Sequence, residues 1–463
     1  MATTQLDHLA LDALRGEVRG GVLQAGDGDY DDARAVYNAM IDKHPAVIVR
    51  CSDTADVIAA VTFGREQGLD IAIRGGGHNG GGLGSVDDGL VIDLSGMRGV
   101  RVDPAARTAV AAGGALLGDV DHATHAFGLA APGGIISTTG LGGLGLGGGV
   151  GHLTRKCGLT IDNFLEVDMV LADGTFVTAN KDQHEDLFWA VRGGGGNFGV
   201  VTSFTLQLHE VSNVWAGPML WPLERTEDVL VFFHDFIGTA PEDLNGFFAF
   251  LTVPPAPPFP EELHLQKVCG IMWCYAGPAD QVDALLAPAR ALGGIALDGV
   301  MELPFPRWNS AFDALYPKGD QWYWRADYVR DIPADAVKLH AEFAAELPSM
   351  QSTMHLYPVD GAAARVANDE TAWAYRDARY AQVMVGVDPD PAKAKEITRW
   401  TVDYFEALHP YSMGGAYVNF MMDEGQDRVQ ATYRDNYERL SRIKARYDPA
   451  NLFHVNQNIY PAT

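Results

Sequence analysis

The chain has 463 residues, of which 47% are apolar, and its formal net charge at pH 7 is -26. That length exceeds one ordinary domain and predicts two or three, each with enough apolar material for its own core. A surface this acidic repels phosphate backbones, so the composition argues against a nucleic-acid-binding protein.

The chain also lacks the patterns of a secreted or membrane protein. The first 20 residues carry acidic side chains and no apolar stretch typical of a signal peptide, and no run of about 18 apolar residues occurs. The four cysteines show neither metal-ligand spacing nor the density of a disulfide framework, and His122 and His125 have no evident third ligand. We therefore expect a cytoplasmic protein without a metal site and without a nucleic-acid or membrane partner.

The first half of the chain predicts alternating strands and helices. Residues 46–50 form a short β-branched run, and Ser52 and Asp53 offer N-caps for a helix over 54–69. A strand over 70–74 then runs into a glycine-rich stretch. The remaining elements of this half are strands over 89–95, 99–103 and 108–114, a helix over 116–128, a hairpin over 165–177 that turns at Asp173-Gly174, and a strand-rich segment over 188–208.

The composition changes near residue 212, where glycine becomes rarer and proline and aromatic residues increase. Residues 253–260 form a proline-rich loop. Amphipathic helices are predicted over 278–292, 334–347 and 391–408, strands over 381–387 and 414–420, and one long helix over 427–447. This half therefore predicts a second domain made of a sheet with helices.

Three glycine-rich tracts, at 74–84, 133–151 and 192–199, are the strongest deviation from average composition. Spacings like those of a Rossmann fingerprint occur in the second tract, but no long helix begins there, so that interpretation is disfavoured. Glycines without Cβ atoms let backbone amides approach a ligand closely and cradle a pyrophosphate. Three such loops are entropically costly without a ligand, so they predict a site for a long molecule such as a dinucleotide rather than flexible loops alone.

Six motifs in one order carry a family resemblance. They are "RGGGHN", "GLGGLGLGGGVGHLTRKCGLTIDN", "VRGGGGNFGVVTSF", "ADYVRDIP", "AYVNF" and "YDPANLFHVNQNI". The series resembles the berberine bridge enzyme-like flavin oxidases of the vanillyl-alcohol oxidase superfamily, over nearly the whole chain. The resemblance implies an α+β fold: a two-part PCMH-type FAD-binding domain (residues 1–212, completed by 425–463) and a substrate domain (213–424) with an antiparallel sheet covered by helices.

The resemblance also implies how FAD is held. In the family, the histidine that follows the paired glycines is bonded to the 8α-methyl group of FAD, and His78 occupies that position. Many members form a second bond through a cysteine four residues before a glycine that aligns with Gly140. That position here is Ile136, which cannot form a thioether, so we expect one covalent bond. Cys157 is better interpreted as a small buried residue than as a second link.

The residues that we expect to bind FAD come from the three tracts and the C-terminal tail. They are Arg74, Gly75, Gly76, Gly77, His78, Asn79, Ser137, Thr138, Thr139, Gly140, Gly142, Gly143, Gly148, Gly149, His152, Gly199, Val201, Asn456 and Asn458.

Catalysis is expected from the strand predicted over 414–420. A strand places Tyr417 and Asn419 on one face. A Tyr-x-Asn pattern recurs in the family with the tyrosine as catalytic base, although a core tyrosine remains an alternative. A phenol has a pKa near 10, so Asn419 or a cation such as Arg376 or Lys318 is needed to stabilise the tyrosinate.

Aromatic residues between 308 and 324 are the remaining candidates for the substrate site. Trp308, Phe312 and Tyr316 have the helical spacing of core residues. Trp322 and Trp324 share one face of a strand, where they either pack in the core or stack on a substrate ring.

We therefore expect an oxidase that transfers hydride from an alcohol or other activated C–H to FAD and reduces O2 to H2O2, as a monomer or homodimer. Oxygen access in the family depends on the residue three after the cysteine position. Here that residue is Thr139, which is small, as expected for an oxidase. A dehydrogenase or an oxidative cyclase of a natural-product pathway is the alternative enzyme, and a flavin-binding protein without turnover is less favoured. The substrate does not follow from the sequence.

Overall fold

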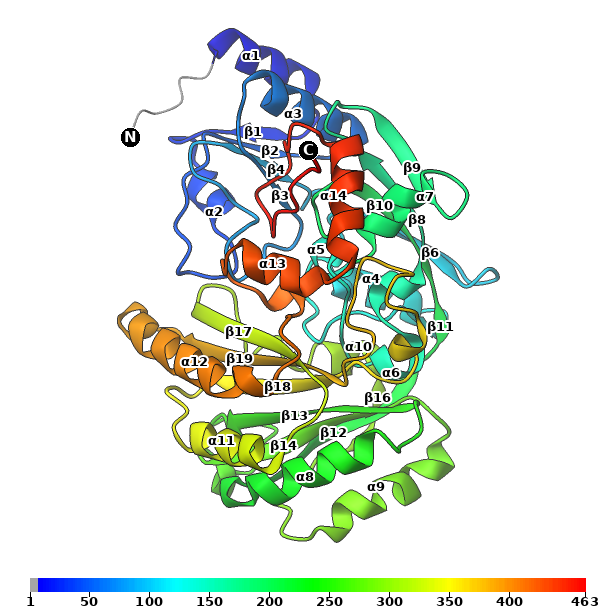
Figure 1. Ribbon diagram of the computed structural model, residues 1–463, viewed down its shortest axis with the longest axis vertical. Coiled ribbons are helices and arrows are strands. Elements are labelled where there is room, and N and C mark those ends of the chain that lie inside the picture. The colour runs from blue at the N-terminus through cyan, green and yellow to red at the C-terminus, as the bar shows by residue number, and fades with distance from the viewer. Residues whose placement is uncertain (1–6) are drawn as a thin grey trace.

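The computed structural model describes residues 7–463; residues 1–6 of the expected first domain lie outside the described part. A four-stranded sheet in the order β1-β2-β4-β3 opens the fold (Figure 1). Its strands β2, β4 and β3 run parallel, as in an α/β unit, and β1 is antiparallel to β2. The strands are β1 (Gly21–Leu23), β2 (Val47–Arg50), β3 (Ile71–Arg74) and β4 (Leu90–Asp93).

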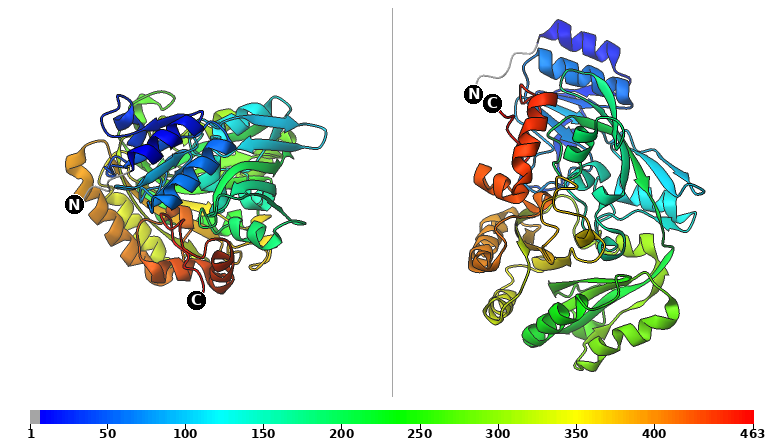
Figure 2. Two further views of the ribbon diagram at one scale, coloured as in Figure 1. Left: turned by 90° about the horizontal axis from the view of Figure 1, so that it is seen from above. Right: turned by 45° about the vertical axis from the view of Figure 1, so that its right-hand side comes forward.

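Two helices, α1 (His8–Glu17) and α3 (Thr54–Glu66), cover the outer face of this sheet (Figure 2). The predicted cap of α3 is confirmed, because the Asp53 carboxylate accepts hydrogen bonds from the amides of Ala55 and Asp56. Leu11, Leu14, Val57 and Val61 are fully buried against the strands. A shorter helix, α2 (Tyr30–Arg34), lies on the segment between β1 and β2.

A five-stranded antiparallel sheet follows in the order β5-β6-β10-β8-β9. The predicted hairpin is confirmed as β8 and β9, and the helix expected over 116–128 forms α4. The elements of this part are β5 (Val100–Asp103), β6 (Thr108–Ala112), α4 (Leu117–His125), β7 (Leu129–Ala130), α5 (Leu141–Leu146), α6 (Thr154–Cys157), β8 (Phe164–Val170), β9 (Phe176–Asn180), α7 (Glu185–Val191), β10 (Val200–Gln207) and β11 (His209–Glu210).

An eight-stranded antiparallel sheet lies below these two sheets in Figure 1. Its main order is β15-β12-β14-β13-β18-β19-β17, and β16 pairs with β12. The strands are β12 (Asn213–Pro222), β13 (Leu244–Thr252), β14 (Lys267–Tyr275), β15 (Leu297–Asp298), β16 (Met301–Pro304), β17 (Gln321–Val329), β18 (Thr353–Pro358) and β19 (Tyr380–Asp388). One face of this sheet points away from the first two sheets. That face is covered by helices α8 (Thr226–Ile237), α9 (Val282–Ala291), α11 (Ala334–Ala345) and α12 (Ala394–Leu408). A short helix, α10 (Phe305–Asn309), packs against α4.

The C-terminal segment returns from the large sheet to the first two sheets (Figures 1 and 2). The prediction of one helix over 427–447 is wrong: α13 (Gln426–Tyr433) and α14 (Asn436–Tyr447) are separated at Arg434, which has φ +47°. The guanidinium of Arg434 lies 3.5 Å from the centroid of the Tyr375 ring and binds Asp377 at 2.6 Å. The break thus coincides with contacts to residues that belong to neither helix. The amphipathic pattern of the sequence does not reveal it.

A fully buried ion pair anchors the tail after α14. Lys444 Nζ donates to Asp448 at 2.7 Å and to the carbonyl oxygens of Asn197 and Phe453 at 2.6 and 2.8 Å. Both charged side chains are 0% exposed. Because Asn197 belongs to the third glycine tract, the pair joins the tail to that tract.

No helix within residues 7–463 has the length and apolar character that a bilayer crossing requires.

Replacing Lys444 tests the contribution of this anchor. Lys444→Met leaves the Asp448 carboxylate buried without its counter-ion, so we expect the free energy of unfolding to fall by about 3–5 kcal/mol. Arg442→Ala is the matched control on the same helix, since Arg442 and Glu438 form an exposed pair and we expect a change within about 0.5 kcal/mol. Urea denaturation of both variants measures the difference; equal midpoints would contradict this role for Lys444.

Candidate active site

A cavity of about 340 Å³ lies between the N-terminal sheets and the large sheet. One wall consists of glycines from all three tracts, and the other carries side chains of β17, β18 and β19. The lining glycines are Gly75, Gly76, Gly77, Gly84, Gly113, Gly134, Gly140, Gly142, Gly143, Gly194, Gly195, Gly196 and Gly199. The tracts therefore form a common wall made largely of main chain.

The first tract begins where β3 ends at the cavity. Arg74, the last residue of β3, binds Asp93 on the neighbouring strand β4 at 2.9 Å, and both side chains are buried. Arg74 Nη1 is buried without a hydrogen-bond partner. Since Arg74 lines the cavity, this N–H group is a donor available to a ligand.

The backbones of the first and second tracts approach closely at Gly76 and Gly140. A Cβ atom on either residue would lie 2.3 Å from the backbone nitrogen of the other. Because both obstructing atoms belong to the main chain, neither position has room for a side chain. This approach also places Thr138 and Thr139 beside His78.

His78 lies in the cavity wall between the two tracts. Its ring stacks on Tyr37, with centroids 4.0 Å apart and an interplanar angle of 22°. Thr138 Oγ1 lies 3.0 Å from Nε2, and Thr139 Oγ1 lies 3.4 Å from Nδ1. Burial lowers the pKa of His78 to about 4, against the opposing hydrogen bond with the Thr138 main chain. At neutral pH the imidazole is therefore uncharged, and one of its nitrogens carries a lone pair.

The third tract and the tail close another side of the cavity. Gly199, Val201 and Asn456, three of the residues expected to bind FAD, line it. Asn456 Oδ1 is buried without a partner, which leaves an acceptor available to a ligand. Asn458, in contrast, is not among the lining residues, and its neighbour Gln457 is.

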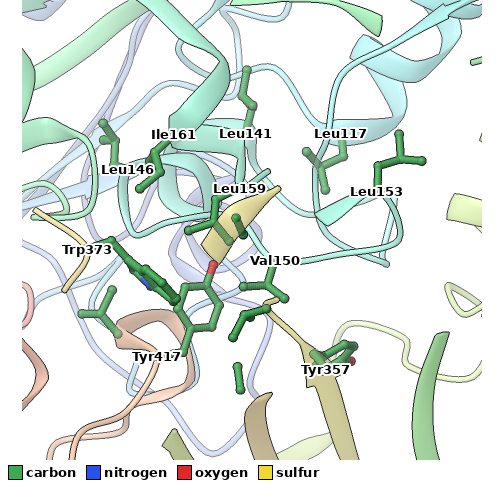
Figure 3. Packing of buried hydrophobic residues seen from close by; sticks show 14 of the residues in the cluster. Leu117, Leu141, Leu146, Val150, Leu153, Leu159, Ile161, Tyr357, Trp373 and Tyr417 are labelled. Atoms are coloured by element: carbon green, nitrogen blue, oxygen red, sulfur yellow. The ribbon is translucent and has the colours of Figure 1, made fainter. Parts of the chain in front are cut away.

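Tyr417 is 2% exposed, and its ring lies among Trp373, Leu159 and Val150 (Figure 3). Its phenolic oxygen accepts hydrogen bonds from the Gly149 amide at 2.8 Å and from Asn419 Nδ2 at 2.7 Å. Burial raises the pKa of Tyr417 to about 12, and these two hydrogen bonds oppose that rise.

The segment that carries Tyr417 and Asn419 is not the predicted strand. Val418–Phe420 forms a turn of 3-10 helix, so the two side chains do not converge by strand alternation. They converge because Asn419 Nδ2 also donates to the Leu144 carbonyl at 2.8 Å. Both hydrogens of this amide are thereby used, which orients it toward Tyr417.

Neither cation considered for Tyr417 is among the residues that line the cavity. Arg376 binds Asp162 at 2.6 and 2.8 Å. Lys318 is exposed, and its pKa is lowered by partial desolvation and by the charge of Arg74. The donors on the Tyr417 oxygen are thus neutral amides.

Several other expected cofactor residues lie behind the lining. His152, which was expected at the cofactor, is not among the lining residues: it is 3% exposed, and its Nδ1 accepts a hydrogen bond from Trp308 Nε1 at 3.2 Å. Ser137 binds Asp313 through its backbone amide at 2.9 Å. Gly148 and Gly149 lie against Tyr417, and Thr138 contacts the His78 ring through its hydroxyl. The remaining expected residues Asn79, Thr139, Gly142 and Gly143 line the cavity.

The cysteine and aromatic candidates are divided between core and cavity. Cys157 lies outside the lining residues, and burial raises its pKa to about 12, so the reactive thiolate is disfavoured. Trp308 and Phe312 are buried in the core as expected. Tyr316 was expected in the core but lines the cavity together with Trp322 and Trp324.

Tyr37, His355 and Tyr357 are among the side chains of the cavity wall that sequence reasoning missed. His355 and Tyr357 alternate on β18, and Nδ1 of the first lies 2.5 Å from the hydroxyl of the second. An alternating strand over 353–358 could have indicated this pair. Tyr37 lies outside any helix or strand, and no pattern around it points to the site.

Comparisons with known proteins agree with this arrangement. Residues 45–180 match the family model described as "FAD binding domain", and residues 416–460 match that described as "Berberine and berberine like". The uncharacterised FAD-linked oxidoreductase YgaK of Bacillus subtilis is 32% identical over 452 residues, 96% of this chain and 98% of that protein.

Two solved structures share the fold. 6-Hydroxy-D-nicotine oxidase from Arthrobacter nicotinovorans superposes with a TM-score of 0.85 at 25% identity, covering 96% of this chain and 98% of that one. A variant of Physcomitrella patens BBE-like 1 gives 0.85 at 25% identity, covering 98% and 99%. The expected α+β architecture is thereby confirmed.

The approach of Gly76 and Gly140 predicts the effect of a single methyl group. Gly140→Ala forces two backbones apart, so we expect the free energy of unfolding to fall by about 1–3 kcal/mol and the flavin bound per chain to decrease. Gly99→Ala is the control, because no atom lies within 4 Å of a Cβ placed there. Chemical denaturation and the ratio of flavin to protein absorbance measure both effects; unchanged flavin content in Gly140→Ala would contradict the prediction.

Proposed function

Because this chain belongs to the berberine bridge enzyme-like FAD-linked oxidoreductases, we propose that it oxidises an alcohol or another activated C–H of a small organic molecule and passes the electrons to O2. The observation that carries the proposal is the single cavity into which both the neutral imidazole of His78 and the Tyr417 ring open. Residues 1–212 and 425–463 would hold the cofactor, and residues 213–424 would bind the substrate.

The residues present fit FAD. Main-chain amides of three glycine tracts line the cavity, and only glycine leaves room for a cofactor at such close range. The unpaired Arg74 Nη1 and Asn456 Oδ1 supply one buried donor and one buried acceptor, as a molecule with phosphate oxygens and N–H or O–H groups requires. Bound FAD supplies an acceptor for hydride from the substrate C–H.

His78 is proposed to attach FAD through its 8α-carbon. One N–H bond and one C–H bond break, one N–C bond forms, and O2 takes up the two electrons and two protons as H2O2. The low pKa of His78 favours this step because the neutral imidazole keeps a lone pair. Ile136 also lines the cavity and has no thiol, so the proposal includes a single bond.

Tyr417 is proposed as the base that takes the hydroxyl proton of the substrate. Its oxygen accepts two N–H hydrogen bonds, an arrangement that favours the negative charge of a phenolate. Asn419 would orient Tyr417 and stabilise that charge.

The wall opposite the glycines indicates the type of substrate. Among the described residues that line the cavity, Arg74 is the only one of the Lys, Arg, Asp and Glu types, and it is paired with Asp93. The wall opposite the glycines includes the aromatic residues Tyr316, Trp322 and Trp324. We therefore propose an uncharged substrate, because a charged group against the wall opposite the glycines would lack a counter-ion.

Covalent attachment is tested by acid precipitation of the purified protein. We expect a yellow pellet from the wild type and a colourless pellet with a yellow supernatant from His78→Ala. Cys157→Ala is the matched control and should keep its colour in the pellet, because Cys157 lies outside the cavity lining. Release of the chromophore from the wild type would refute the covalent bond.

The role of Tyr417 predicts a pH dependence. The basic form is the phenolate and the pKa is about 12, so the rate of flavin reduction should rise about tenfold per pH unit from about pH 7 to about pH 10 without a plateau. Tyr417→Phe should lower the rate by about 10² to 10⁴-fold and abolish this slope. Stopped-flow reduction measures it, with Tyr404→Phe, a buried tyrosine on α12, as the control; a pH-independent rate in the wild type would argue against Tyr417 as the base.

The electron acceptor is tested by product yield. Uncharged aromatic alcohols and reducing sugars are first screened for compounds that bleach the flavin in the absence of air. The enzyme then oxidises each such compound in air, and the H2O2 formed is measured. We expect one H2O2 per substrate molecule oxidised, since Thr139, the position on which oxygen access is expected to depend, lines the cavity with a small side chain. Fast bleaching with no H2O2 in air, but turnover with an artificial dye, would instead identify a dehydrogenase.

A further inference from the structure

A short segment of three residues, Tyr37, Asn38 and Ala39, joins the His78 loop to the large sheet. On one side, the Tyr37 amide donates to the Gly77 carbonyl at 3.0 Å. On the other side, the Gly319 amide donates to the Tyr37 carbonyl at 3.0 Å, and the Ala39 amide donates to the Asp320 carbonyl at 2.9 Å. The segment therefore bonds through its main chain to both walls of the cavity.

The side chain of Asn38 reinforces both connections. Its Nδ2 donates to the carbonyls of Gly80 and Trp322 at 2.8 and 2.9 Å, and its Oδ1 accepts from the amides of Met40 and Trp322, each at 3.0 Å. Asn38 is 1% exposed, and all hydrogen-bonding groups of its side chain are used. Such a saturated buried amide holds the segment in one position relative to the glycine loop and to β17.

From this fixed position, the Tyr37 side chain contacts His78. Its ring stacks on the imidazole at 4.0 Å, and its other ring neighbour is Trp322 at 5.2 Å. Its hydroxyl donates to the main-chain carbonyl of Tyr316. Burial raises the pKa of Tyr37, so the phenol stays protonated and this hydrogen bond persists.

His78 has few other contacts that could orient its ring. Its neighbour Gly77 has no side chain and has φ +71°, so the local sequence leaves the imidazole free to turn. Thr138 and Thr139 contact the ring edge, and Tyr37 covers a face. A nucleophile must be held within about 0.5 Å and about 10–20° of its path to react efficiently.

We propose that Tyr37 is the positioning residue for covalent attachment: its ring, fixed between the glycine loop and β17 by Asn38, holds the His78 imidazole at the angle required for bond formation with FAD. This inference rests on the covalent link proposed above. According to this inference, the ring of Tyr37 has a larger effect on the rate of FAD attachment than its hydroxyl has.

The test compares two variants of the full-length protein. Wild type, Tyr37→Phe and Tyr37→Leu are produced without flavin in riboflavin-starved cells and then mixed with FAD. Acid-precipitable flavin is followed with time. We expect Tyr37→Phe, which keeps the ring, to attach FAD at close to the wild-type rate, and Tyr37→Leu to be slower by about tenfold or more.

Reversible FAD binding and thermal denaturation separate positioning from folding. We expect Tyr37→Leu to bind FAD reversibly and to unfold cooperatively while attaching it slowly. Equal attachment rates in all three proteins, or equal slowing in Tyr37→Phe and Tyr37→Leu, would overturn the proposal. If Tyr37→Leu fails to fold, Tyr37→Met takes its place; failure of both would assign Tyr37 to the fold and also overturn it.

The outcome for the wild type keeps this inference distinct from the proposed function. A wild type that binds FAD without a covalent bond contradicts the proposed attachment itself. A wild type that attaches FAD, together with Tyr37→Leu at an unchanged rate, contradicts the role of Tyr37 alone.

Discussion

The active site depends on two main-chain segments that approach too closely for either to carry a side chain. At Gly76 and Gly140, a Cβ atom on one backbone would lie 2.3 Å from the nitrogen of the other. Steric exclusion, rather than any strong attraction, therefore determines the residue type at both positions. The same approach brings the Thr138 hydroxyl to 3.0 Å from His78 Nε2. A wall built in this way presents amides to a cofactor and keeps the histidine at its edge.

Burial acts in opposite directions on the pKa values of the two reactive side chains. It lowers the pKa of His78 to about 4 and raises that of Tyr417 to about 12, because in each case the charged form loses solvation. The effect favours a nucleophilic imidazole, which must be neutral. It opposes a tyrosinate, which must be charged. The two N–H groups directed at the Tyr417 oxygen counter that effect locally. One belongs to the distant Gly149, and the other belongs to Asn419, whose amide also donates to the distant Leu144 carbonyl.

Local patterns predicted the elements whose stability comes from neighbouring residues. The helix after Asp53 begins at its predicted cap, and the turn at Asp173-Gly174 joins β8 and β9. The predictions failed where distant contacts override the local pattern. Residues 414–420 have a strand-like composition, yet the bonds of Asn419 to Leu144 and Tyr417 accompany a 3-10 turn. The helical pattern over 427–447 likewise continues through Arg434, where the backbone reverses to a positive φ.

The sequence by itself determined the family, the three glycine tracts, the histidine among them and the isoleucine at position 136, because each of these is a residue type at a fixed spacing. Tertiary structure alone decided that His152 packs behind the cavity, that Tyr37 stacks on His78 and that Gly149 donates to Tyr417, 268 residues away. Local periodicity describes which face of a segment is buried, but not what lies against that face. Contacts between segments so far apart depend on how three sheets pack around one cavity, and only the folded chain specifies that packing.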